Sequence, residues 1–322
     1  MSEPETISKP SAPVPPAARL TRLWPLGLLL VAGLVLCAGW WVTRARLADE
    51  IAARAAALRG EGYRIEMSEP QFGGFPYRMK VTLARLSVAA PSGWAVKLGP
   101  VEAEALLFDL GHWVFAAENG LTLTRPEGGD VRIGAARLRA SLTALDAPTP
   151  RLAVEGVDLV VTTPPGARPF SLSRADRMEV YTRTSAADPR SAEALIRLDN
   201  AAVTPGTVAA PVFRQRRISA ALSVRMIRRD AFQGPSWAAA ARNWRSVGGR
   251  IEIDPTTPPG PDLRLAVAGG GFSLGDDGRL QGAAPLTLTA PDGARIAELG
   301  LRLDADGAAL GPLRLGPSPR VF

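Results

Sequence analysis

The chain is poor in the residues that most often build reactive sites. Its 322 residues include one cysteine, Cys37, and one histidine, His112. A single cysteine cannot form an intrachain disulfide, so the cysteine count does not indicate a redox compartment. A lone histidine cannot share a metal ion with other histidines, and no nucleophile–base–carboxylate set accompanies it. The composition therefore disfavours an enzyme, and we expect no catalytic residue, no metal site and no cofactor.

Lysine is also scarce, and arginine carries almost all of the positive charge. Lys9, Lys80 and Lys97 are the only lysines among 38 basic residues, and the chain has a formal net charge of +7 and a pI of about 10.4. The arginine bias, together with abundant alanine, glycine and proline, is better explained by a GC-rich genome than by a ligand that arginine would bind. A basic exterior is attracted to anionic lipid head groups. We do not expect nucleic acid as a partner.

Charged residues are absent from residues 23–42, LWPLGLLLVAGLVLCAGWWV. A helix of about 20 residues spans roughly 30 Å of hydrocarbon, so this run predicts a transmembrane helix. Trp24 lies at one end of it and Trp40 and Trp41 at the other, and aromatic rings favour both membrane interfaces. A cleaved signal peptide needs a shorter apolar region and small residues at its cleavage site. Because the two tryptophans occupy that place, we favour an uncleaved anchor.

The segments on either side of the anchor differ in character. Residues 1–22 are rich in proline, serine and alanine, and they predict a disordered tail. Residues 43–60 keep a helical spacing of apolar residues, with Leu47, Ile51 and Leu58 on one face, and we expect the helix to end at Gly60 and Gly62. From residue 61 to residue 322 the period changes from helical to two, which predicts a β-rich domain.

Alternating strands and proline–glycine turns dominate this domain. Tyr77, Met79, Val81 and Leu83 alternate with polar or small residues, as in a half-buried strand. Four similar strings predict the tips of long β-hairpins, because proline presets φ in a turn and the glycine two residues later tolerates the exit geometry. These strings are LSVAAPSG from Leu86, LTLTRPEG from Leu121, LVVTTPPG from Leu159 and LTLTAPDG from Leu286.

One segment departs from the alternation. Residues 236–247, SWAAAARNWRSV, place Trp237, Ala241 and Trp244 on one helical face, with Pro235 before them and two glycines after them. These are start and stop signals of a helix. We expect a short helix that covers an open end or edge of the sheet, with its tryptophans packed rather than binding a ligand.

Two isolated motifs are weak evidence for chemistry. Residues 271–275 match the G-x-S-x-G pattern around Ser273, but that motif needs a strand–turn–helix and a histidine later in the chain. Here His112 lies far upstream, and an alternating strand follows. We therefore interpret His112 as a structural residue near a turn.

An arginine-rich run surrounds one predicted strand. Its middle alternates from Ile218 to Val224, so arginines gather near both ends. The simpler interpretation is that these arginines form a rim exposed to solvent. The more specific interpretation is that this rim binds anionic lipid head groups. The residues of this rim are Arg214, Arg216, Arg217, Arg225, Arg228 and Arg229.

Several segments in order carry a resemblance to a known family. They are the anchor with its following helix, GGFPYRMKV at 73–81, NWRSVGGRIEID at 243–254, and the closing strings at 272–288 and 301–317. Together they resemble the domain of unknown function 2125 family of alphaproteobacterial envelope proteins. The resemblance implies a periplasmic domain of uncharacterised function and supplies no catalytic residues. The architecture is also distantly similar to AsmA-like envelope proteins, which are thought to hold lipid in a β-groove, but this is an analogy of fold.

The charges on the two sides of the anchor do not determine its orientation in the membrane. The expected orientation therefore rests on the resemblance. Long domains translocate largely regardless of charge, so we place the tail in the cytoplasm, the anchor in the inner membrane and the large domain in the periplasm.

We expect an elongated, curved, mainly β antiparallel sheet with long hairpins and one short covering helix. The first hypothesis for its function is a non-catalytic module whose apolar face binds membrane lipid. The second hypothesis is a scaffold that docks another envelope protein. The third and least favoured hypothesis is a hydrolase. Strand register, which would separate the first two, is not visible in a sequence.

Overall fold

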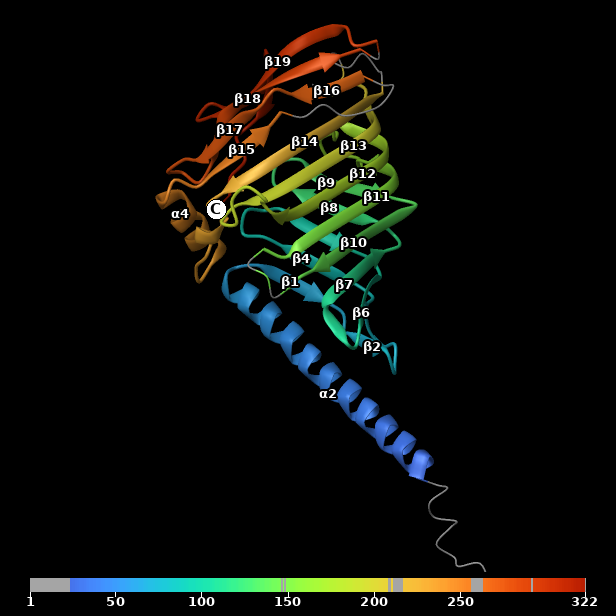
Figure 1. The fold of residues 1–322 in the computed structure, drawn as a ribbon. Helices are drawn as coiled ribbons and strands as arrows, with labels where there is room; N and C mark the ends of the chain where they lie inside the picture. Colours follow the sequence, from blue (N-terminus) through green and yellow to red (C-terminus); the bar gives the residue numbers. More distant parts are fainter. Residues whose placement is uncertain are drawn as a thin grey trace, which may run out of the picture.

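A computed structural model describes residues 24–145, 147, 149–207, 210, 217–255, 263–290 and 292–321. It contains a long N-terminal helix that projects from an elongated β body, as the sequence predicts (Figure 1). The C-terminus lies beside a short helix on the flank of this body. Over the described residues the fold is therefore mainly β, with one large sheet, the short helix and the long apolar helix.

The long helix α2 (Trp24–Gly60) is continuous through the apolar run and the segment that follows it. Its apolar part is almost entirely exposed and has a mean hydropathy of 2.1 over its best window, a length and composition typical of a membrane anchor or a signal sequence. The helix ends as expected at two glycines, since Gly62 has a φ of 88° that other residues rarely adopt.

The β body contains twenty-one strands among the described residues. They are β1 (Arg64–Met67), β2 (Gln71–Gly73), β3 (Arg78–Leu83), β4 (Leu86–Ala89), β5 (Ala95–Leu98), β6 (Val101–Leu106), β7 (Asp109–Ala117), β8 (Leu121–Arg125), β9 (Gly129–Gly134), β10 (Arg137–Thr143), β11 (Arg151–Thr162), β12 (Leu172–Thr184), β13 (Ala192–Val203), β14 (Ile218–Ile227), β15 (Arg250–Asp254), β16 (Leu263–Val267), β17 (Gly270–Leu274), β18 (Leu280–Thr289), β19 (Arg295–Asp304), β20 (Gly307–Leu310) and β21 (Leu313–Gly316).

Two sets of short strands meet on one long strand. We call the series β2–β3–β6–β7–β10 the first wall and the series β1–β4–β5–β8–β9 the second wall. The first half of β11 pairs with β10, and its last residues pair with β9. The chain turns between these halves at Asp158, whose φ is 52°. In Figure 1 the teal strands β8 and β9 lie behind the green strands β11 and β12.

The interruption of β11 at Asp158 has counterparts in the next two strands, at Asp176 in β12 and at Asn200 in β13, and we call this line of three residues the crease. Asp158 lies between the register pairs that join β11 to β12, opposite Asp176, and Asn200 has a φ of 48° in β13. The Asn200 amide donates a hydrogen bond to Asp176, and its backbone N–H donates to Ser219 Oγ at 3.2 Å. Polar side chains thus satisfy backbone and amide groups where the ladder is interrupted.

Beyond the crease the sheet divides once more. The start of β14 pairs with β16 and its end pairs with β15, and β18 rejoins both branches through β16 and β17. The expected large antiparallel sheet is confirmed, and among the described strands the β14–β16 pairing is the one that runs parallel. A parallel pair needs a crossover connection, and the chain between β14 and β16 contains the short helix and β15.

All four predicted hairpin tips are confirmed. They join β4 to β5, β8 to β9, β11 to β12 and β18 to β19, each as an antiparallel pair. Gly93, Gly166 and Gly293 have φ values between 84° and 89° at three of the tips, and Gly129 takes this role at the remaining one, with a φ of 70°. Glycine is needed there because other residues disfavour positive φ.

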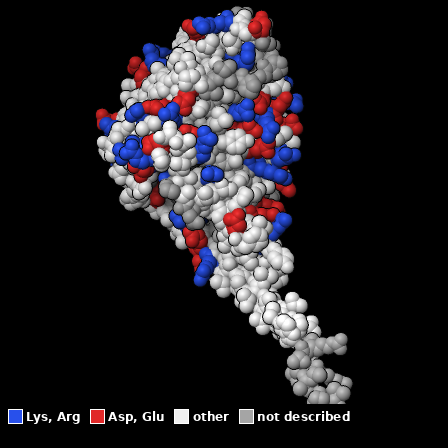
Figure 2. Space-filling model, viewed as in Figure 1, with Lys and Arg blue, Asp and Glu red and all other residues white. Residues whose placement is uncertain are grey.

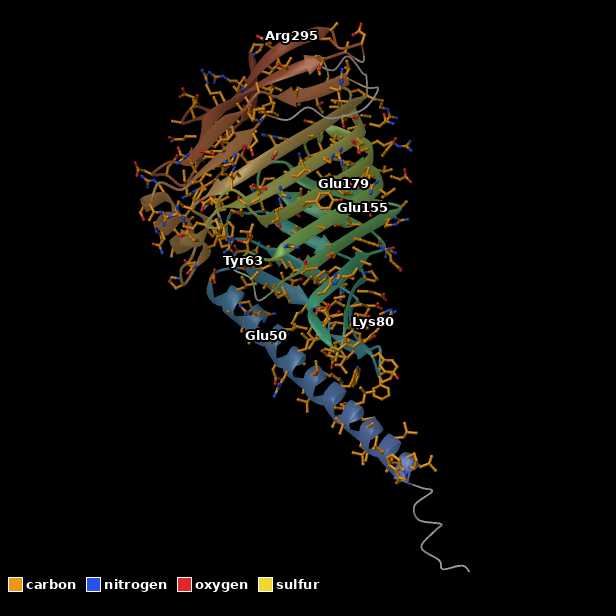
Figure 3. The ribbon with its side chains drawn as sticks, viewed as in Figure 1. Glu50, Tyr63, Lys80, Glu155, Glu179 and Arg295 are labelled. Carbon is orange, nitrogen blue, oxygen red and sulfur yellow. The ribbon has the colours of Figure 1, made fainter. Side chains whose placement is uncertain are left out.

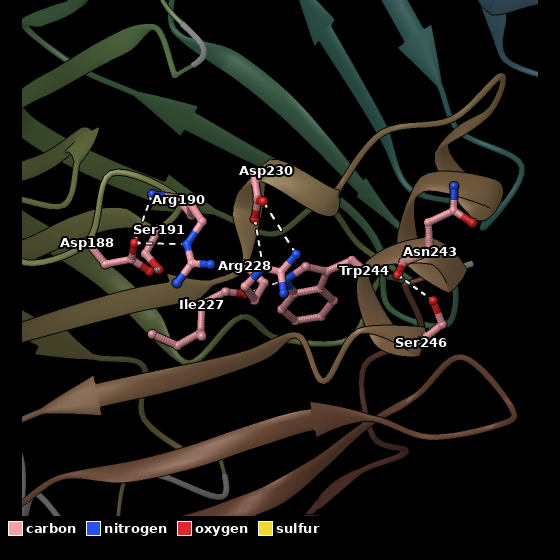
Figure 4. A network of polar contacts seen from close by, with 9 residues as sticks. All are labelled: Asp188, Arg190, Ser191, Ile227, Arg228, Asp230, Asn243, Trp244 and Ser246. Atoms are coloured by element: carbon pink, nitrogen blue, oxygen red, sulfur yellow. Dashed lines mark hydrogen bonds and ion pairs between the residues drawn. The ribbon is translucent and has the colours of Figure 1, made fainter.

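The predicted short helix is α4 (Trp237–Ser246), and it packs where β14, β15 and β17 end. Ser236 caps it by accepting a hydrogen bond from the Ala239 N–H at 3.2 Å. Ala241 and Trp244 are buried against Leu274. Figure 4 shows Trp244 beside Ile227, whose carbonyl accepts a 2.6 Å hydrogen bond from the indole, and beside the Arg228–Asp230 ion pair of η1 (Arg229–Ala231) and its N-cap.

The largest fully buried side chains lie in the strands. Met79 of β3, Leu159 of β11 and Leu288 of β18 each expose 2% or less of their surface. Tyr77, which the alternation placed in the same strand as Met79, instead lies in the preceding turn and is 64% exposed. The alternation holds only from Arg78 onward, where the register pairs of β3 with β6 begin.

Candidate functional site

Four strands of the first wall (β3, β6, β7 and β10) and the strands β11–β14 that continue the sheet share one apolar face. Register pairs bring one residue of each strand into a single row, and residues that pair directly share a face. The row is Val81, Ala103, Phe115, Ala140, Val154, Val180, Ile196 and Leu222. This face, which we call the inner face, is built by residues that lie up to 141 positions apart in the sequence.

The opposite face of the same strands is charged and internally paired. Glu155 pairs with Arg177, which also contacts Glu179 at 2.9 Å, and Arg197 lies 3.7 Å from Glu179. Near the base, Lys80 Nζ lies 2.8 Å from Glu102 Oε2, and this hydrogen bond raises the pKa of Lys80. Figure 3 labels Lys80, Glu155 and Glu179, and Figure 2 shows both signs of charge mixed over the body. Over the described residues, this outer face therefore carries both signs of charge in paired side chains.

The second wall presents its own apolar row. Register pairs align Met67 of β1, then residues of β4, β5, β8 and β9, and finally Val161 at the end of β11. The row in between consists of Leu86, Leu98, Leu121 and Ile133.

The two apolar rows face each other across a cavity of about 350 Å³. Its lining comes from both walls, and thirteen of the fourteen lining residues are apolar, with Arg139 as the exception. The lining residues are Val81, Leu83, Leu86, Leu98, Val101, Ala103, Phe115, Ala116, Ala117, Leu121, Leu138, Arg139, Ala140 and Val154. A pocket of this size and polarity suits an apolar ligand without charged partners.

The apolar face continues beyond this cavity but is not equally covered. Ile196, in the same row, is 38% exposed, whereas Val180 and Leu222 are half-buried. At the far end, the strands after β14 pack into a closed core around Ile253, Phe272 and Leu286. The inner face is thus sealed at the far end and only partly covered in the middle.

A second hollow, of about 540 Å³, lies on the outer side of β10–β14. Its lining includes Arg151, Tyr181, Arg183 and Glu193, and Arg183 and Glu193 pair with each other at 2.9 Å. Ser185 Oγ also donates a hydrogen bond to Glu193, which lowers the pKa of this carboxyl group. Because these groups satisfy one another, the smaller apolar cavity is the better candidate site.

The structure spreads the predicted arginine rim along β14. Arg217 precedes the strand and Arg228 follows it, roughly 35 Å apart at the rise of an extended chain. Arg225 lies between them on the outer face, and its hydrogen bond to Asp254 raises its pKa. Arg228 pairs with Asp230, and Arg229 begins η1. Arg214 and Arg216 lie outside the described residues, so the head-group rim stays a prediction.

The predicted anchor tryptophans lie in different surroundings. Trp24 and Trp41 are exposed, whereas Trp40 is only 6% exposed. The Trp40 indole donates a 3.0 Å hydrogen bond to the carbonyl of Arg78, and its ring meets Phe75 edge to face at 5.8 Å. Trp40 therefore joins the helix to the β2–β3 hairpin.

Ser273 and His112, the residues of the two weak chemical motifs, lie in different strands. Ser273 is in the extended strand β17, opposite Gln281 and Arg250, and not at a strand–helix turn. His112 is exposed in β7, with its Nε2 3.4 Å from Ser141 Oγ. Within the described part of the chain, no group of three His, Cys, Asp or Glu side chains could hold a metal ion.

Sequence reasoning alone could not identify the cavity. The alternation in β3, β10 and β11 is a visible signal, but the facing residues of the second wall come from other hairpins. Which hairpins meet depends on long-range register.

Comparison with known proteins gives one match. No curated protein and no solved structure matches the chain. A family model described as "Uncharacterized protein conserved in bacteria (DUF2125)" matches residues 40–301, from the end of the apolar run to β19. The matched region contains both walls, the crease and α4. Since it covers most of the chain, the protein belongs to the DUF2125 family.

Proposed function

We propose that this protein is a non-catalytic module that binds the acyl chains of a membrane lipid in the cavity between its two walls. The observation that carries the proposal is the lining, in which Arg139 is the only residue that is not apolar. Each apolar side chain left in water costs free energy, at about 25 cal/mol per Å² of surface, so an apolar ligand gains by covering this lining.

Support for the proposed location comes from the exposed apolar run of α2. The apolar run would act as an uncleaved anchor in the inner membrane, with the β body in the periplasm. Arg44 and Arg46 directly follow the run, and long side chains of this kind can reach from a helix end to lipid head groups. The anchor would then keep the cavity close to its source of ligand.

A photoreactive phospholipid tests the cavity directly. The full chain is reconstituted with a phospholipid that carries a diazirine in its acyl chain, and crosslinked peptides are mapped by mass spectrometry. We expect crosslinks on α2 from the surrounding bilayer and, separately, crosslinks on β4, β8 and β10 from lipid in the cavity.

A pair of neighbouring substitutions provides the control. Ala140 faces the cavity and Ser141 faces outward on the same strand, and both are half-buried. Ala140→Trp should fill the cavity and lower the crosslinks in the β body roughly tenfold, about 1.4 kcal/mol of binding. Ser141→Trp should leave them unchanged, and both variants should keep the α2 crosslinks. If the unaltered chain is labelled on α2 alone, the lipid proposal is wrong and a scaffold that docks an envelope protein becomes the better hypothesis.

A further inference from the structure

Three aromatic side chains at the base of the β body are exposed together. Phe75 and Tyr77 lie in the turn between β2 and β3, and Phe108 lies in the turn between β6 and β7. They expose 52%, 64% and 80% of their surface, respectively. We call these three residues the aromatic tips. Contiguous patches of exposed apolar side chains often mark surfaces that bind a protein or a membrane.

Backbone contacts hold the two turns side by side. The Leu107 N–H donates a 2.9 Å hydrogen bond to the Tyr77 carbonyl, and Arg78 pairs in register with Leu106. Leu106 and Leu110, which flank Phe108, are also exposed, at 41% and 37%. The two turns therefore bring the exposed apolar side chains of the tips and of these leucines to one place at the base of the body.

Phe75 joins the aromatic tips to the apolar run of α2. Phe75 contacts Trp40, and the Arg44 guanidinium lies 4.8 Å from the ring centroid of Trp41 and 5.5 Å from that of Phe72. These contacts place the turns beside the end of the run, where its last apolar residues give way to arginine. Figure 1 shows β2 at the lower edge of the body, alongside the middle of α2.

We propose that the aromatic tips insert into the interfacial layer of the same bilayer that α2 crosses. Aromatic rings favour this layer, and the tips lie level with the residues at which the helix would leave the hydrocarbon. Insertion removes their surface from water and gives the body a second attachment besides the helix. The body is then held with its base against the membrane. The proposal rests on the proposed anchoring of α2, and it does not depend on a ligand in the cavity.

Site-directed spin labelling measures this insertion on the full chain. The chain is reconstituted in nanodiscs of phosphatidylethanolamine and phosphatidylglycerol, and nitroxide accessibility to oxygen and to a water-soluble nickel complex gives the depth. The native Cys37 carries the first label and reports whether α2 lies in hydrocarbon. In a Cys37→Ala background, Phe108→Cys reports the tips, and Ile296→Cys is a matched control on β19, because Ile296 is an apolar residue that is 44% exposed.

We expect the label at position 108 to have an oxygen-to-nickel accessibility ratio between those at positions 37 and 296. Adding Phe75→Ser and Tyr77→Ser should shift the ratio at position 108 toward the value at position 296, because these substitutions remove the two aromatic tips that the labelled chain still has. Equal values at positions 108 and 296, with a lipid-exposed label at position 37, would overturn the insertion and leave the anchor intact. A water-exposed label at position 37 would overturn the anchoring and the insertion together.

Discussion

Trp244→Ala is expected to lower the free energy of unfolding of the β body by about 3–5 kcal/mol, in the range of large-to-small core substitutions. Trp244 is 3% exposed and packs with Ala241 and Leu274 between α4 and the sheet. Its loss leaves a cavity and also removes the indole donor from the Ile227 carbonyl, which lies in the strand that α4 covers. Urea unfolding of the full chain in detergent, followed by circular dichroism of the β signal, measures the change.

Trp237→Ala is the matched control in the same helix. Trp237 is 50% exposed, although its ring lies 4.8 Å from that of Phe232 and its indole donates to the Val321 carbonyl. We expect a loss of about 1–2 kcal/mol, from one hydrogen bond and one aromatic contact. Equal effects of the two substitutions would show that α4 does not stabilise the sheet through its buried face.

Gly282→Ala should lower the free energy of unfolding by a comparable amount, but for a different reason. Gly282 has a φ of 149°, and a Cβ at this position would lie 2.0 Å from the Gly271 carbonyl oxygen and 2.8 Å from the Phe272 Cα. The clash is with backbone, which cannot rotate away as a side chain can. The backbone strain alone costs about 1–3 kcal/mol, and the separation of β17 from β18 adds to it. Urea unfolding midpoints compare the variant with the unaltered chain.

Gly300→Ala on the adjacent strand is the control for this substitution. No atom lies within 4 Å of a Cβ built at Gly300, and its φ is not in the positive range. Alanine there should be neutral or should stabilise by about 0.4–1 kcal/mol, because it restricts the unfolded chain. Destabilisation by Gly300→Ala as large as that by Gly282→Ala would contradict the close approach of β17 and β18.

These two predictions concern the far end of the body, where the inner face is filled by side chains. The proposed lipid site and the aromatic tips concern the end near the anchor, where the same face lines the cavity. A closed core at one end and a cavity at the other separate stability from ligand binding, so substitutions at Trp244 or Gly282 should not change which peptides a photoreactive lipid labels in the folded fraction.

Local features were predictable because they depend on neighbouring residues. The uncharged run and the spacing of Leu47, Ile51 and Leu58 determined a long helix, the proline–glycine strings determined four hairpins, and Ser236 with the glycines after Val247 bounded α4. Each of these signals acts over a few residues through turn geometry, capping or hydrophobic periodicity.

The candidate site depended on contacts that no local signal specifies. Alternation along β11 places Val154 and Glu155 on opposite faces of the sheet, but it does not specify that Val154 faces the second wall. That required the crease at Asp158, where a positive φ in a residue other than glycine sends one strand into two ladders. The parallel β14–β16 pair and the burial of Trp40 against the β2–β3 hairpin are long-range in the same sense. The sequence by itself therefore determined the strands, the hairpins and the apolar helix, and only the tertiary structure decided which apolar faces meet, because strand register is set by packing between distant segments.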